Sequence, residues 1–268
     1  MRDELAAAVA AAEAGAARVR AAEGATGQVR SKSSATDLVT ETDIAAGVAV
    51  WEAIVAHDPA ARLVIEEDEV HDLTGAPRGS LTDSEVWCVD PLDGTTSFVH
   101  GFPAYSVSVA LLREGVPVAG AVANVPLGET VAAATGLGAR LDGTQIRCAS
   151  ATRLDEALLI TGFPYDRGAL LDRQLAALTA FLRAPVHGIR RDGSAAIDCT
   201  HVATGRADGF WEFGLKPWDT AAGVVICREA GAHVTGIDGE EWSVASTGII
   251  AANPVLHPLI TEVVLAGA

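Results

Sequence analysis

Residues 86–96, VWCVDPLDGTT, are the most informative segment for the fold and the function. In this segment an apolar run leads directly into two aspartates three residues apart. The apolar residues predict a buried strand. Pro91 fixes φ and lacks an N–H, and Gly94 permits a tight bend, so we expect a rigid turn after the strand. In that turn the carboxylates of Asp90 and Asp93, with the leucine carbonyl between them, would point to one side and suit Mg²⁺. The segment alone leaves open an ordinary Asx-type turn with solvated aspartates.

Other acids occupy comparable positions along the chain. Glu66 and Glu67 close the apolar run 62–65, Asp43 opens an expected helix, and Asp219 lies in the first turn of another. Taken singly, the acids at helix starts are explained by the helix macrodipole, which favours negative charge there. Together they are less ordinary, because ligands of α/β sheets bind at strand ends and helix starts.

Two hydroxyl residues, Thr95 and Thr96, follow the aspartates where a helix could begin, and hydroxyls with free backbone N–H groups form a phosphate cradle. A metal cluster beside such a cradle indicates hydrolytic phosphoryl chemistry. The sequence has no G-x-x-x-x-G-K-[ST] loop, no G-x-S-x-G elbow and no H-E-x-x-H, and residues 136–138 lack the third glycine of a dinucleotide site.

Composition and charge exclude further classes of protein. The chain has 268 residues, with 19 Lys+Arg against 35 Asp+Glu and a net charge of −16. That charge disfavours nucleic acid and anionic membranes, whose binding depends on cationic side chains. No apolar run approaches the ~18 residues of a spanning helix. The four cysteines form no C-x-x-C pair, and the N-terminus lacks a signal-peptide pattern, so we expect a soluble, cytoplasmic protein.

Hydrophobic patterning predicts a layered mixture of helices and strands, α/β or α+β, without repeats or low-complexity linkers. We expect one unit over 1–268, with an α+β part to about 150 and an α/β part over 151–268. Residues 71–84 read as a loop and 105–149 as successive antiparallel strands. The expected helices are 3–22, 44–57, 170–182, 194–203 and 217–230, and the further strands are 62–65, 86–89, 158–161 and 207–213.

Several blocks together resemble the inositol monophosphatase family of the Mg²⁺-dependent, lithium-sensitive phosphatase superfamily. They match in order and spacing, and they are 37–43 (DLVTETD), the Glu66–Glu67 pair, 90–103 (DPLDGTTSFVHGFP), 193–196 (GSAA), 207–212 (ADGFWE) and 218–223 (WDTAAG). The resemblance implies an α-β-α-β-α sandwich of the inositol monophosphatase and fructose-1,6-bisphosphatase type, usually a homodimer. It also implies two to three Mg²⁺ ions and a small phosphorylated polyol as substrate.

Site residues follow from the same resemblance, motif by motif. Glu66, Asp90 and the Leu92 carbonyl resemble ligands of a first Mg²⁺, and Asp90, Asp93 and Asp219 resemble those of a second. Thr95 with Asp43 resembles the pair that orients and deprotonates the attacking water, and Glu66 and Asp93 join them in the catalytic set. Lys32 matches a basic position near a third metal. The implied substrate contacts are Leu92, Asp93, Gly94, Thr95, Gly193, Ser194, Ala195, Glu212 and Asp219.

The best substrate on this basis is myo-inositol 1-phosphate. The same apparatus serves histidinol phosphate, fructose 1,6-bisphosphate and 3′-phosphoadenosine 5′-phosphate, while Glu212 and the uninterrupted GSAA segment favour a neutral polyol. Departures from the family pattern at Ile65, Asp68, Ser97 and Asp192 bear on substrate rather than on the reaction. A different-class alternative is a regulatory binding protein that keeps the fold, since fold alone does not fix function.

Overall fold

The computed structural model describes residues 1–24, 29–31 and 38–266. Its helices are α1 (Arg2–Ala21), α2 (Glu41–His57), α3 (Glu69–Thr74), α4 (Thr95–His100), α5 (Ala169–Arg183), α6 (Ala195–Ala203), α7 (Pro217–Glu229) and α8 (Leu256–Ala266), with a 3₁₀ turn at Leu154–Glu156. The strands of the first half are β1 (Val29–Ser31), β2 (Leu38–Thr40), β3 (Leu63–Ile65), β4 (Val86–Asp93), β5 (Ser106–Arg113), β6 (Val116–Asn124), β7 (Glu129–Ala134), β8 (Ala139–Leu141) and β9 (Thr144–Gln145). Those of the second half are β10 (Leu158–Thr161), β11 (Gly188–Arg190), β12 (Gly209–Phe213), β13 (His233–Gly236) and β14 (Gly248–Ala252).

Two sheets organise the molecule. The first has seven strands in sequence order, β3-β4-β5-β6-β7-β8-β9, and only its β3–β4 pair is parallel. The second has five strands in the order β11-β10-β12-β14-β13, with β10 parallel to both of its neighbours. A separate antiparallel pair joins β1 and β2.

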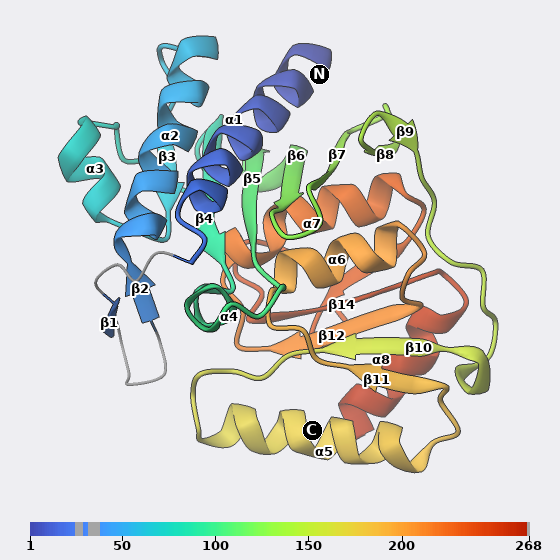
Figure 1. Cartoon of the computed structure of the whole chain (residues 1–268). Helices are drawn as coiled ribbons and strands as arrows, with labels where there is room; N and C mark the ends of the chain where they lie inside the picture. The colour runs from blue at the N-terminus through green and yellow to red at the C-terminus, as the bar shows by residue number, and fades with distance from the viewer. Residues whose placement is uncertain (25–28, 32–37, 267–268) are drawn as a thin grey trace.

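Helices cover both faces of each sheet, so the layers alternate (Figure 1). α1 and α2 pack on the outer face of the seven-stranded sheet, α6 and α7 lie between the two sheets, and α5 and α8 cover the outer face of the five-stranded sheet. This is the α-β-α-β-α sandwich that the family resemblance implies, and it confirms that prediction. Each sheet is buried on both faces, which explains why its strands read as continuous apolar runs.

Small residues let the layers approach closely. A Cβ at Gly15 of α1 would lie 2.7 Å from a Val50 methyl group of α2. In the middle layer, a Cβ at Gly120 of β6 would lie 2.9 Å from Ala222 Cα of α7. Because packing at these positions leaves no room for a methyl group, α1 lies close against α2, and α7 lies close against β6.

Most predicted elements are confirmed within a few residues, but three differences have clear causes. The expected loop 71–84 is wrong at its start, where α3 continues to Thr74 and ends at Gly75 with φ +69°. α2 begins at Glu41 rather than residue 44, because Thr40 and Asp43 form a capping box. β1, β2, β11, β13 and β14 were missed because each has only three to five residues, too few for a clear periodic pattern, and α8 was missed as well. None of the helices in the described ranges is long and apolar enough to cross a membrane.

Candidate active site

The acidic segment at the end of β4 owes its geometry to a bulge. Asp90 pairs with Ser108 of β5, and Asp93 pairs with Ser106, so three steps on β4 oppose two on β5. In a regular strand, residues three apart face opposite sides of the sheet. The extra residue cancels this difference and brings both carboxylates to the face that meets the middle layer. The shared direction was predicted from a turn, whereas the structure produces it with a strand irregularity.

Gly94 continues the segment into α4 with φ +93°. A Cβ there would lie 2.6 Å from the Ala104 carbonyl oxygen, so a side chain is excluded by both conformation and space. α4 begins at the next residue, as the sequence suggested, and Thr95 is its first member. The bend therefore delivers the Thr95 hydroxyl to the end of β4.

A buried pair links α4 to α2. The Thr95 hydroxyl lies 2.8 Å from Asp43 Oδ1 and 3.0 Å from the Leu92 carbonyl oxygen, and both of these atoms are acceptors. Asp43 Oδ2 accepts the Thr40 N–H at 2.8 Å and the Thr40 hydroxyl at 2.6 Å. Asp43 is only 1% exposed. The carboxylate is thus held from one side by its helix cap and directs its other oxygen at Thr95.

Asp219 is positioned by the start of α7. Pro217 occupies the first turn, where its missing N–H costs nothing, and Asp219 Oδ2 accepts the Lys216 N–H at 2.7 Å. α7 lies between the sheets and its N-terminus points at the end of β4.

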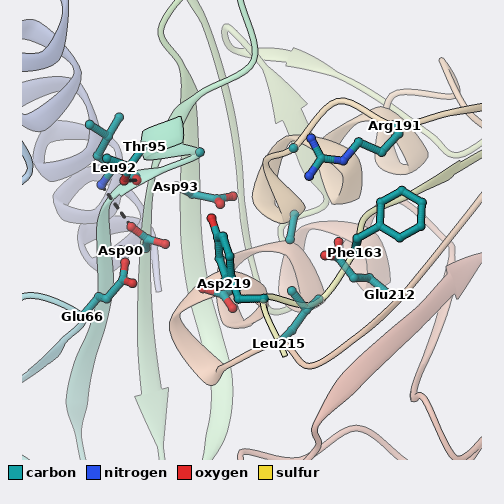
Figure 2. A pocket seen from close by; sticks show the side chains of 14 residues that line it. Glu66, Asp90, Leu92, Asp93, Thr95, Phe163, Arg191, Glu212, Leu215 and Asp219 are labelled. Carbon is teal, nitrogen blue, oxygen red and sulfur yellow. Dashed lines mark hydrogen bonds between the residues drawn. The ribbon is translucent and has the colours of Figure 1, made fainter. Parts of the chain in front are cut away.

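These parts line one pocket (Figure 2). Glu66, Asp90, Leu92 and Thr95 lie on one side, Asp93 and Asp219 near the middle, and Glu212, Arg191 and Phe163 opposite. The full lining is Glu66, Asp90, Leu92, Asp93, Gly94, Thr95, Phe163, Tyr165, Arg191, Gly193, Ala195, Glu212, Leu215 and Asp219. Residues more than 150 positions apart in sequence therefore share a single concave surface.

Two residues of the implied set lie behind this lining. Asp43 is not part of the lining, and it accepts a hydrogen bond from the Thr95 hydroxyl, which is. Ser194, implied as a substrate contact, is 1% exposed, and its hydroxyl donates to Asp93 Oδ2 at 2.7 Å. The Ala196 N–H donates to the same oxygen at 2.8 Å. Lys32 lies outside the described residues.

Negative charge dominates the pocket and perturbs its own titration. Burial raises the pKa of Asp93 to about 6, against the lowering effect of the bonds from Ser194 and Ala196. Burial also raises the pKa of Asp219 well above its usual range, and repulsion from Asp93 and Glu66 adds to the shift. Like charges in a desolvated site disfavour one another's ionisation. A divalent cation would relieve this repulsion.

The donor set fits such a cation. Carboxylate and carbonyl oxygens are the ligands that Mg²⁺ prefers, and the acidic lining supplies the charge to balance it. Within the described ranges, no three His, Cys, Asp or Glu side chains already meet as a closed ligand group. The carboxylates surround the pocket instead of converging on one point.

The far end of the pocket has different chemistry. Burial and repulsion from Asp93 raise the pKa of Glu212 to about 8, while Arg191 opposes the rise. A Cβ at Gly162 would lie 2.2 Å from Glu212 Oε2, so the backbone closely supports the carboxyl group. A buried carboxyl that can both donate and accept suits a hydroxylated ligand.

Sequence reasoning missed Phe163, Tyr165, Arg191 and Leu215 in the lining. Phe163 and Tyr165 follow the end of β10, and Arg191 follows β11, so strand ends carried the available signal. This signal requires that the strand itself is predicted. Because β11 was not predicted, there was no indication that Arg191 follows a strand end.

Comparison with known proteins identifies the family of this protein. The family model described as the inositol monophosphatase family matches residues 1–266. The protein belongs to the inositol monophosphatase family. It is accordingly an enzyme of the phosphatase class, as the motifs predicted.

Individual relatives cover much of the chain. An inositol-1-monophosphatase of Synechocystis is 40% identical over 230 residues, covering 86% of this chain and 77% of that protein. A putative Nus factor SuhB of Neisseria meningitidis serogroup B is 39% identical over 230 residues, covering 86% and 85%. The chloroplastic phosphatase IMPL1 of Arabidopsis thaliana is 39% identical over 232 residues, covering 84% of this chain, which spans 60% of that protein. The solved inositol monophosphatase of Anabaena superposes with a TM-score of 0.83 at 33% identity, covering 99% of this chain and 96% of that one.

Proposed function

We propose that this protein is a Mg²⁺-dependent phosphomonoesterase that hydrolyses myo-inositol 1-phosphate to inositol and phosphate. The observation that carries the proposal is the pocket itself, in which Glu66, Asp90, Asp93 and Asp219 face a hydroxyl held by a buried carboxylate. The name of the Synechocystis relative supports the choice of substrate.

Oxygen ligands for the metal come from both sides of the pocket. Glu66, Asp90 and the Leu92 carbonyl would hold a first Mg²⁺, and Asp90, Asp93 and Asp219 would hold a second. A third Mg²⁺ ion is also compatible with this function. Bound Mg²⁺ supplies a lowered pKa for a coordinated water and neutralises charge on the phosphate. The Asp90–Asp93 bulge contributes to both sets, which explains why two aspartates must share a face.

The Thr95–Asp43 pair would handle the proton of the attacking water. Thr95 orients the water through its hydroxyl oxygen, while its own proton is directed at Asp43 Oδ1. Because Thr40 donates both of its hydrogen bonds to Asp43 Oδ2, the carboxylate is oriented with Oδ1 toward the Thr95 hydroxyl. Gly94 and Thr95 would receive the phosphate with their backbone N–H groups, which lie at the bend beside the carboxylates.

The opposite end of the pocket would recognise the alcohol. Glu212 would bind polyol hydroxyls, and Gly193 and Ala195 would contact the ring from the start of α6. Ser194 would act there through Asp93 rather than by touching substrate. Glu212 would favour a polyol, because its buried carboxyl group can both donate hydrogen bonds to hydroxyl groups and accept them.

A substrate panel at saturating Mg²⁺ tests this function. We expect the highest kcat/KM with inositol 1-phosphate and loss of phosphate release on adding EDTA. Asp93→Asn should lower kcat at least about 100-fold, as removal of a major electrostatic group does. Asp172→Asn, which removes the same charge from the exposed face of α5, is the matched control. Preference for histidinol phosphate, fructose 1,6-bisphosphate or 3′-phosphoadenosine 5′-phosphate would overturn the choice of substrate.

The relatives named Nus factors favour a second candidate, a regulatory binding protein on the same fold. Loss of a catalytic acid would be its signature, yet Asp43, Glu66, Asp90, Asp93 and Asp219 are all present. Failure to release phosphate from every ester in the panel would support this second candidate. A homodimer is also part of the proposal, and light scattering after size-exclusion chromatography would show its mass directly.

A further inference from the structure

A fully buried hydroxyl stands behind the acidic pocket, at a position that no motif singled out. Ser106 begins β5, is 0% exposed, and is the strand partner of Asp93. Its hydroxyl lies 3.1 Å from the Ser194 hydroxyl, which in turn lies 2.7 Å from Asp93 Oδ2. A buried hydroxyl is costly unless it is hydrogen-bonded, so this contact accounts for a polar side chain at a fully buried position of β5.

The direction of these hydrogen bonds follows from counting protons. Ser194 has one hydroxyl hydrogen, and the carboxylate of Asp93 can only accept, so Ser194 donates to Asp93. Ser194 must then accept from Ser106, as it also accepts the Ile197 N–H at 3.3 Å. Donation therefore runs in one direction, with Ser106 donating to Ser194 and Ser194 donating to Asp93.

These hydrogen bonds determine which carboxylate oxygen of Asp93 faces the pocket. Oδ2 receives both Ser194 and the Ala196 N–H, while Oδ1 accepts no hydrogen bond within the described part of the chain. Ser194 is the N-cap of α6, so the same hydroxyl fixes the helix start and the carboxylate. Without Ser106, the Ser194 hydroxyl would lose one of the two donors that keep its hydrogen pointed at Asp93.

We propose that Ser106 is a positioning residue, which acts through Ser194 to hold Asp93 with Oδ1 toward the metal-binding side of the pocket. The proposal rests on the proposed function only in taking Asp93 as a Mg²⁺ ligand. It extends the site from the residues that line the pocket to a strand of the first sheet.

Mg²⁺ affinity measured by titration calorimetry tests the proposal without relying on turnover. Ser106→Thr keeps the hydroxyl and Ser106→Val replaces it with a methyl group of the same shape, so the pair separates hydrogen bonding from packing. We expect Val to bind Mg²⁺ about fivefold more weakly than Thr, the effect of one neutral hydrogen bond. Ser106→Ala, which is smaller than the native residue, repeats the comparison with the native chain should Val prevent folding. Thr235→Val removes a buried hydroxyl of β13 that is hydrogen-bonded to His257 of α8, and it should leave Mg²⁺ affinity unchanged.

Kinetics give a second readout. With inositol 1-phosphate, the half-saturating Mg²⁺ concentration should rise about fivefold in Ser106→Val, while KM for substrate at saturating Mg²⁺ stays unchanged. Equal Mg²⁺ affinity in the Thr and Val variants would overturn the positioning role even if the enzyme hydrolyses its ester, and so would a native chain that binds no Mg²⁺. Weaker Mg²⁺ binding in Val, in a protein that hydrolyses no ester, would support the positioning role and overturn the proposed function.

Discussion

Replacing Asp43 by Asn would reverse one hydrogen bond while leaving the fold nearly intact. Thr40 presents two donors to Asp43 Oδ2, its N–H and its hydroxyl. The backbone N–H can only donate, so an amide NH₂ group in the place of Oδ2 would leave two donors facing each other 2.8 Å apart. An asparagine must therefore place its carbonyl oxygen toward Thr40 and its NH₂ toward Thr95. The Thr95 hydroxyl would then accept from the amide and donate to the Leu92 carbonyl, 3.0 Å away.

The size of the effect differs between catalysis and stability. Thr95 would no longer direct its proton at a carboxylate, and losing a positioned proton acceptor lowers kcat about 10²- to 10⁴-fold. The fold exchanges a charged acceptor for a neutral one at the start of α2, which costs about 1 kcal/mol in the free energy of unfolding. A large kinetic loss with a small loss of stability is the expected signature.

Phosphate release at saturating Mg²⁺ and urea unfolding measure the two quantities. Glu41→Gln is the matched control, because it removes the same charge from the same helical turn on an exposed side chain that does not contact Thr95. Its kcat should match that of the native protein. An Asp43→Asn enzyme with native kcat would refute the role of this pair.

Three further predictions concern the polyol end, the core and the pH dependence. Gly162→Ala would displace the Glu212 carboxyl, 2.2 Å from the new Cβ, and should raise KM for inositol 1-phosphate about tenfold in steady-state assays. Phe181→Ala would remove a fully buried ring 4.5 Å from that of Trp211 and should lower the free energy of unfolding by about 3–5 kcal/mol in urea. Burial lowers the pKa of His257 to about 4, so the unfolded chain binds its proton first as pH falls. Stability should therefore fall from about pH 6.5 to about pH 4, and less so in His257→Asn, as urea unfolding at several pH values would show.

Each of these has an internal control. Phenyl phosphate lacks the polyol, so Gly162→Ala should leave its KM unchanged, and an equal rise for both esters would contradict the role of Glu212. Leu182→Ala removes a 67% exposed side chain next to Phe181 and should change stability by less than about 0.5 kcal/mol. Parallel pH profiles for His257→Asn and the native chain would show that this histidine does not titrate with unfolding.

The sequence predicted the participants of the candidate site better than the means that arrange them. Asp90 and Asp93 were expected to share a direction, but their three-residue spacing on a strand implies the opposite unless a bulge intervenes. That bulge depends on how β4 pairs with Ser106 and Ser108, which no local pattern reveals. The five-layer architecture was available only through the family motifs, because periodicity by itself supported several layered folds.

Long-range contacts account for what was missed. Ser194 was implied as a substrate contact, yet its hydroxyl is occupied by Asp93, a residue 101 positions earlier. Arg191 entered the pocket from β11, a three-residue strand whose existence depends on pairing with β10. Such features follow from tertiary pairing, which local propensity does not encode.

The middle layer also limits how the pocket can exchange its ligands. α6 and α7 contact both sheets, and one continuous apolar core runs from Val86 of β4 to Ile249 of β14. A hinge that swung one half of the molecule from the other would have to split this core, which is a large cost for a motion repeated at each turnover. We therefore expect entry and release to depend on movements of single side chains at the rim, such as the 51% exposed Tyr165, with the scaffold standing still throughout.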